Sequence, residues 1–135
     1  MELITLDEKK YVDIGTVDIW NSVYSTVIIR LEKLENQIPL AIEFLRTGNC
    51  RGCDAQETAR QINLIRDALS QIAPEKVVYD YKDQSIPAPW GDNISPVITS
   101  CGNMFTTADG KDLLFELVAI LTYAYVRKTN IVIAE

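Results

Sequence analysis

The sequence KDLLFELVAILTYAYV, residues 111–126, decides how the rest of the chain is arranged. Apolar residues stand on nearly every side of a helix drawn through it, interrupted after Asp112 only by Glu116 among the charged residues. A helix that is apolar all round is normally buried by other elements on every side. We therefore expect this helix to be central in the domain.

A second helix is expected over residues 54–72, where it is the clearest amphipathic helix of the chain. Its start, Asp54-Ala-Gln-Glu57, has the form of a capping box, with Asp in place of the usual Ser or Thr. The apolar residues recur at the spacing of one helix face. They are Ala55, Ala59, Ile62, Ile65, Leu69 and Ile72.

Two further helices are expected in the first part of the chain. One follows Gly15, is capped by Thr16 or Asp18, and ends at Asn36, because apolar residues recur at a spacing of three and four up to Leu34. The other runs from about residue 39 to residue 46. It begins with a proline, which the first turn of a helix tolerates, and Gly-Asn follows it.

Short strands complete the predicted fold. Residues 2–6 and 11–14 flank a charged turn and are expected to form a hairpin, and 77–81 and 131–133 also have strand composition. About four helices and four short strands predict one α+β domain over residues 1–135, with a small, mostly antiparallel sheet.

Composition excludes several classes of function. The chain has 135 residues, of which 13 are Lys or Arg, 19 are Asp or Glu and none is His, so the net charge is −6. Without histidine the chain holds no Ser-His-Asp triad, Cys-His dyad or imidazole zinc site. An acidic chain repels nucleic acid, whereas it suits a basic protein partner. We expect a binding protein rather than an enzyme, with no cofactor.

Residues 82–107 show no periodicity and contain Pro87, Pro89 and Pro96. Apolar residues within the segment favour an ordered loop, and an ordered loop of this length is usually functional. Trp90 stands between a proline and a glycine. It either anchors the loop to the core or is a binding hot spot, and we regard both interpretations as open.

Acidic residues dominate the same part of the chain. No Lys or Arg occurs between residues 83 and 110. One interpretation is a negative surface that attracts a basic partner. The other is a solvated loop whose carboxylates stabilise turns and helix starts. The candidate partner-binding residues are Asp83, Trp90, Asp92, Asp109, Asp112 and Glu116.

Cys50-Arg51-Gly52-Cys53 is the one stretch that resembles a chemical motif. A dithiol at a helix N-terminus can be redox-active, and Cys101 with Asp54 would complete a metal site of four ligands. Two ordinary loop thiols are the simpler interpretation. Redox chemistry and a zinc-stabilised interaction module are the alternatives.

Tyr11, Tyr123 and Tyr125 are expected to pack in the core with their hydroxyl groups at its rim.

The location expected for the chain is the cytoplasm. The first residues, MELITLDEKK, do not have the pattern of a signal peptide. The longest apolar stretch is shorter than the roughly 18 residues that a membrane span needs. An odd number of cysteines fits a reducing compartment.

Several segments resemble the immunity protein 70 family. The residues that carry this likeness are PAPWGDNISP at 87–96, VITSCGNMF at 97–105 and TTADGKDLL at 106–114, together with VDIGTVD at 12–18. The strand-like residues after the helix that ends near residue 72 also fit. Ala88, Met104 and Leu114 depart from the family pattern, where Pro, Tyr and Phe are expected, and each departure changes packing only.

The resemblance implies a function in toxin–immunity systems. Such a protein binds the C-terminal domain of a polymorphic or contact-dependent inhibition toxin and protects the cell that produces it. The implied partner is a basic toxin domain, of which a nuclease is the leading example, with no direct nucleic acid or membrane contact. The oligomeric state, the toxin and the mode of inhibition stay open at this stage.

Overall fold

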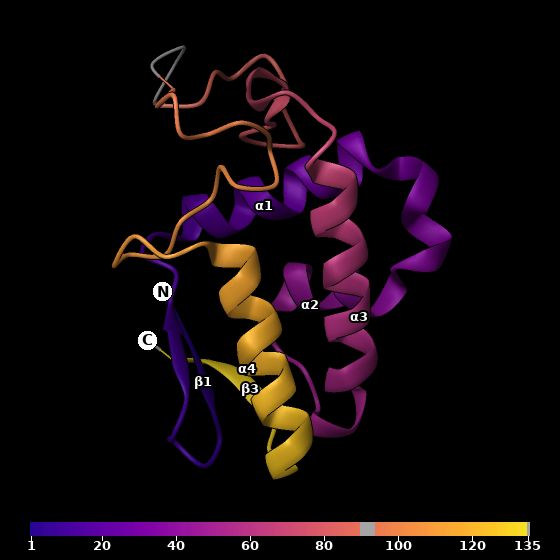
Figure 1. Ribbon diagram of the computed structural model, residues 1–135, viewed down its shortest axis with the longest axis vertical. Helices are drawn as coiled ribbons and strands as arrows, with labels where there is room; N and C mark the ends of the chain where they lie inside the picture. Colours follow the sequence, from indigo (N-terminus) through magenta and orange to yellow (C-terminus); the bar gives the residue numbers. More distant parts are fainter. Residues whose placement is uncertain (90–93, 135) are drawn as a thin grey trace.

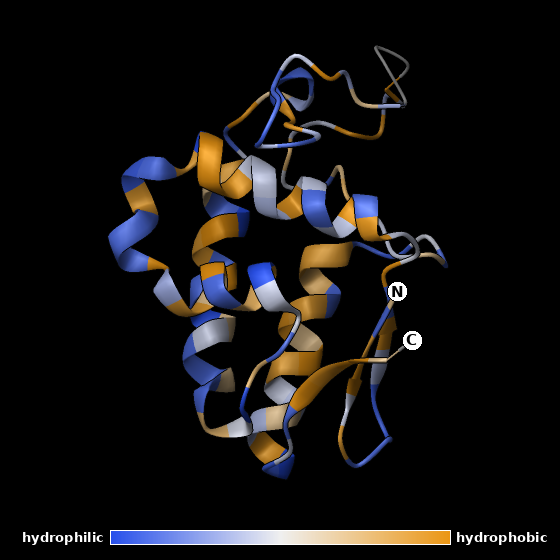
Figure 2. Ribbon diagram, turned by 180° about the vertical axis from the view of Figure 1, so that it is seen from behind, coloured by the Kyte–Doolittle hydropathy of each residue, from blue (hydrophilic) through white to orange (hydrophobic). Residues whose placement is uncertain are grey.

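Helices α3 (Gly52–Leu69) and α4 (Leu113–Arg127) lie side by side at the centre of the computed structural model, which describes residues 1–89 and 94–134 (Figure 1). The buried side chains of α4 are fully shielded from solvent: Leu113, Leu114, Leu117, Ile120, Leu121 and Ala124. The predicted position of this helix is confirmed. Hydrophobic colour follows α4 along its length (Figure 2).

Helix α1 (Val17–Arg30) crosses one end of the α3–α4 pair, and the Oγ1 of Thr16 caps it by accepting a hydrogen bond from the amide of Ile19. The predicted continuation to Asn36 is wrong, because the backbone tightens after Arg30 into the 3₁₀ segment η1 (Glu32–Gln37). Apolar spacing persists across this break since Leu31 and Leu34 still face the core. The short helix α2 (Pro39–Thr47) follows as predicted and ends at a glycine in the left-handed region.

The predicted capping box at the start of α3 is also wrong. The helix begins at Gly52, its N-cap is Arg51, and no side chain makes a capping hydrogen bond there. Asp54 instead lies in the first turn, 3.1 Å from the guanidinium of Arg51, where a carboxylate complements the helix dipole. Glu57 pairs with Arg60 on the exposed face of the helix.

Three strands form one antiparallel sheet in the order β2-β1-β3, with β1 at Glu2–Thr5, β2 at Tyr11–Asp13 and β3 at Ile131–Ala134. The predicted hairpin is therefore confirmed. Alternation along the strands gives the sheet one buried face, formed by Leu3, Thr5, Val12 and Ile131. This α+β fold confirms the predicted class.

The strand predicted over residues 77–81 is wrong. This segment follows the 3₁₀ turn η2 (Pro74–Lys76) and lies on α1 without a strand partner among the described residues. Its backbone groups bond to hydroxyl side chains of the helix, so its strand-like composition serves a different packing arrangement.

Candidate partner-binding surfaces

Residues 77–83 are fixed to α1 by buried hydroxyl groups. The hydroxyls of Ser22 and Thr26 donate to the carbonyl oxygen of Val78 at 2.9 and 3.2 Å. The amide of Val78 donates to the Oγ1 of Thr26 at 3.0 Å, and the amide of Tyr81 donates to the Oγ of Ser25 at 3.0 Å. These bonds give the exposed residues that follow a fixed base on the helix.

The described second half of the loop is held near the ends of α3 and α4. The amide of Cys101 donates to the carbonyl of Ile72 at 2.9 Å, at the end of α3. The Oδ1 of Asn103 accepts hydrogen bonds from two loop amides, and the amide of Ala108 donates to the carbonyl of Asp13 in β2 at 2.9 Å. The loop is therefore ordered against the helices and the sheet, in the ranges that the structure describes.

Asp109 and Asp112 have local structural roles. The hydroxyl of Thr107 donates to Asp109, and this bond holds the pKa of the Asp109 carboxyl below its usual value. The ammonium of Lys111 lies 3.4 Å from the same carboxylate. The Oδ1 of Asp112 accepts the amide hydrogen of Phe115 at 3.2 Å and so caps α4. Both arrangements match the interpretation of carboxylates that stabilise turns and helix starts.

The structure brings together only some of the predicted acidic residues. Asp109 and Glu116 line one groove beside β2, with a volume of about 340 Å³, together with Lys9, Lys10 and Lys111. Asp112 lines a separate hollow beside the C-terminal end of α3. The groove that contains Asp109 and Glu116 therefore carries both signs of charge.

Asp83 is exposed on the segment that lies over α1, away from the groove beside β2. The hydroxyl and the amide of Ser85 both donate to it, which lowers the pKa of the Asp83 carboxyl. Trp90 and Asp92 lie outside the described residues.

The three cysteines do not meet. Cys50 pairs through its backbone with Ile131 in β3, while Cys53 is exposed in the first turn of α3. Cys101 contacts the chain at the other end of α3, roughly 25 Å away along an 18-residue helix. Within residues 1–89 and 94–134 no three His, Cys, Asp or Glu side chains are grouped as a metal site.

The two buried thiols are also poor nucleophiles. Burial raises the pKa of the Cys50 thiol, and it raises the pKa of the Cys101 thiol to about 11. The thiolate is the form that attacks disulfides and binds metals, and it is scarce in both groups near neutral pH.

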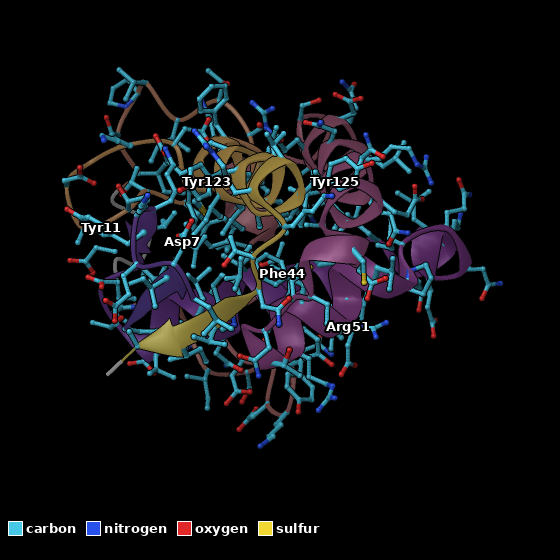
Figure 3. The ribbon with its side chains drawn as sticks, turned by 90° about the horizontal axis from the view of Figure 1, so that it is seen from below. Asp7, Tyr11, Phe44, Arg51, Tyr123 and Tyr125 are labelled. Atoms are coloured by element: carbon cyan, nitrogen blue, oxygen red, sulfur yellow. The ribbon has the colours of Figure 1, made fainter. Side chains whose placement is uncertain are left out.

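The predicted core position of the tyrosines is wrong for Tyr11, whose side chain is 63% exposed, and for Tyr125, which is 41% exposed. The hydroxyl of Tyr123 donates to Asp7 at 2.9 Å and so ties the hairpin turn to α4. Figure 3 shows Tyr11 and Asp7 at one side of the molecule and Tyr125 and Arg51 at the other. The alternation of Tyr11 with inward-facing Val12 is the sequence pattern that predicts an exposed Tyr11.

A second surface missed by sequence reasoning lies where α3 begins and α4 ends. A hollow of about 610 Å³ is lined there by Arg51, Cys53, Tyr125, Val126 and Lys128. It combines exposed apolar side chains with two cations. Its residues come from distant parts of the chain, so no local pattern predicts it.

These features define a small α+β domain in which three of the candidate residues, Asp109, Asp112 and Glu116, line surface grooves. The chain belongs to the immunity protein 70 family, whose model matches residues 4–133. Membership in a family of immunity proteins implies that its partner is a toxin. No curated protein and no solved structure matches the chain. In the described part of the chain, every helix is too short or too polar to cross a bilayer.

Proposed function

We propose that this protein binds the C-terminal toxin domain of a cognate polymorphic or contact-dependent inhibition toxin and neutralises it in the cytoplasm of the producing cell. The proposed toxin is a basic nuclease, and the protein acts by binding, without catalysis. The observation that carries the proposal is the family match over residues 4–133, which covers the four α-helices, β2 and most of the rest of the sheet.

Charge and composition support the same function. A net charge of −6 accelerates association with a basic toxin, which favours an inhibitor that must act before damage accumulates. The sequence holds no histidine, the residue most often used for general acid–base catalysis near neutral pH. A protein that only has to occupy a toxin surface does not need such a residue.

Rescue of a poisoned cell tests the proposal. The toxin C-terminal domain encoded by the neighbouring gene is expressed in a sensitive cell with and without this chain. We expect growth to recover when both are made, and the two proteins to purify as one complex. Absence of rescue and of a complex, beside a neighbour shown to be toxic, would overturn the proposal.

The variant Cys53→Ser separates this function from thiol chemistry. The Cys53 side chain is exposed at the start of α3, so its replacement leaves the fold intact. Rescue by this variant should equal that by the unmodified chain. Loss of rescue at normal protein levels would instead favour a redox function.

Charge reversal tests the acidic loop as part of the binding surface. The triple variant Asp83→Lys/Asp92→Lys/Asp109→Lys is expected to lower the association rate with the toxin by on the order of tenfold at low salt. The difference should shrink as salt is raised, because ions screen exposed charges. Stopped-flow or surface-based kinetics at several salt concentrations measure this.

An equal change of net charge elsewhere is the control. Glu32 and Glu35 are exposed on η1 and Glu57 is on the outer face of α3. Reversing these three should slow association less than reversing the loop residues. Equal effects of both triple variants would mean that only the total charge matters and that the toxin binds elsewhere.

A further inference from the structure

The strand register divides the sheet into a buried face and an outer face. The amides of Thr5 and Ile14 donate to the carbonyls of Lys10 and Met1, each at 3.0 Å. The Glu2–Asp13 and Ile4–Tyr11 rows alternate with the hydrogen-bonded rows, and in such rows opposite side chains approach most closely. We call the side opposite the buried residues the outer sheet face. It carries Glu2, Ile4, Tyr11, Asp13, Val132 and Ala134, and Leu6 follows β1 in the hairpin turn.

An apolar row crosses the outer sheet face from one edge to the other. Ile4 is the register partner of both Tyr11 and Val132. Ile4 and Val132 are half-buried, yet neither belongs to the hydrophobic core or packs against it. Tyr11 is 63% exposed, and Leu6 beside the row is 58% exposed.

No described helix covers this row. Figure 1 places the hairpin at the edge of the molecule, with α4 on its inner side. Aromatic side chains are enriched at the centre of protein–protein interfaces, and exposed groups of apolar residues mark such sites.

The neighbouring row carries two carboxylates, of which Asp13 also lines the groove beside β2 that contains Lys9, Lys10 and Lys111. Glu2 and Asp13 are register partners on adjacent strands. The Oδ1 of Asp13 accepts the amide hydrogen of Gly15 at 2.9 Å, so the carboxylate is held in place. Neither group belongs to an ion pair in the ranges that the structure covers. Like charges directly opposite each other destabilise a sheet.

We propose that the outer sheet face is part of the docking surface for the toxin domain, an inference that rests on the proposed function. The toxin places an apolar side chain on the Tyr11–Ile4–Val132 row and a Lys or Arg between Glu2 and Asp13. The cation relieves the repulsion between the two carboxylates, so the pair costs stability in the free protein and strengthens the complex. Because the chain has a net charge of −6 and this row carries two carboxylates, a basic protein fits the face better than a second copy of the acidic chain.

The first test compares two exposed tyrosines at opposite sides of the molecule (Figure 3). Tyr11→Ala should raise the Kd for the toxin domain on the order of 30-fold or more, as truncation of an interface hot spot does. Tyr125→Ala changes the other candidate surface, the hollow beside Arg51, and should leave Kd within about twofold if the outer sheet face docks the toxin. A large loss of affinity in Tyr125→Ala with none in Tyr11→Ala would overturn the inference. Circular dichroism and Tm verify that both variants fold.

The second test uses the carboxylate pair, where stability and affinity should change in opposite directions. In Glu2→Lys the new ammonium faces Asp13 across the strands, so the Tm of the free protein should stay the same or rise. The same variant should bind the toxin at least about tenfold more weakly, because it repels the incoming cation. A residue with a purely structural role would not separate the two readouts in this way.

The outcomes distinguish this inference from the proposed function. If the unmodified chain forms no complex with the toxin, the proposed function itself fails. If it binds and Tyr11→Ala and Glu2→Lys bind equally well, the outer sheet face is not part of the docking surface. A dimer of the chain alone that Tyr11→Ala converts to a monomer, as measured by light scattering, would assign the face to a second copy and overturn the inference.

Discussion

Replacing Gly52 with alanine should destabilise the protein by about 3 kcal/mol, the upper range for forcing an added methyl group into a packed contact. A Cβ at this position would lie 2.6 Å from the carbonyl oxygen of Thr129 and 3.2 Å from that of Ala124. Both are backbone atoms at the end of α4, so no side chain can rotate away to make room. The ends of the two central helices must therefore move apart.

Thermal unfolding measures this effect. For a domain of this size, about 3 kcal/mol corresponds to a fall in Tm of about 10 °C. Cys53→Ala is the matched control, because it is the next residue, lies in the same turn of α3 and is exposed. We expect its Tm to change by no more than about 2 °C, as is usual for surface substitutions. If Gly52→Ala were as stable as Cys53→Ala, the close approach of the helices would not limit stability.

The close contact at Gly52 also explains why Cys50 and Cys53 stand three residues apart. Cys50 pairs with Ile131 of β3, Gly52 allows α3 to begin against the end of α4, and Cys53 faces outward. The spacing of the two thiols follows from this packing. A sequence shows the spacing, whereas the contact that gives Gly52 its role involves residues far along the chain.

The parts of the fold that sequence patterns predict are those governed by local periodicity. In α3 and α4 the apolar residues recur at a spacing that places them on buried surfaces only if the segment is a helix. The hairpin follows from alternation around a charged turn. Boundaries were predicted less well, because Leu31 and Leu34 keep their core positions when the helix tightens to 3₁₀ geometry.

The candidate binding residues were harder to predict, because a surface is assembled from separate segments. Asp109 and Glu116 share a groove with lysines from the hairpin turn, which is far away in sequence. Glu2 and Asp13 are seen to be opposite each other only once the register of the hairpin is known. The number and order of charged residues along the chain predict neither the shared groove nor the pairing of Glu2 with Asp13.

Residues 77–81 also depend on contacts with a distant segment, because side chains of α1 hold them in place. Val, Val and Tyr favour a strand, and a strand must bond to a neighbouring backbone. Here the hydroxyls of Ser22 and Thr26 take the place of that backbone. Both hydroxyl-bearing residues are fully buried on α1.

The double variant Ser22→Ala/Thr26→Val should therefore destabilise the protein by about 3 kcal/mol, since each buried group left without a partner costs about 1–3 kcal/mol. Val78 is buried, and the double variant removes the partners of both its amide and its carbonyl oxygen. Valine has nearly the shape of threonine, so a cavity at Thr26 does not account for the loss.

Thermal unfolding and hydrogen exchange together identify the cause. Thr122→Val is the control, because Thr122 is exposed on α4 and its hydroxyl bonds only within the helix, to the carbonyl of Val118. Its Tm should change little, while the double variant melts about 10 °C lower, given the usual relation for this size. The amide of Val78 should also exchange faster, since residues 77–83 lose their anchor before the core unfolds. An unchanged exchange rate would mean that the segment is held by its apolar contacts, and that the hydroxyls of α1 do not position the loop that carries Asp83.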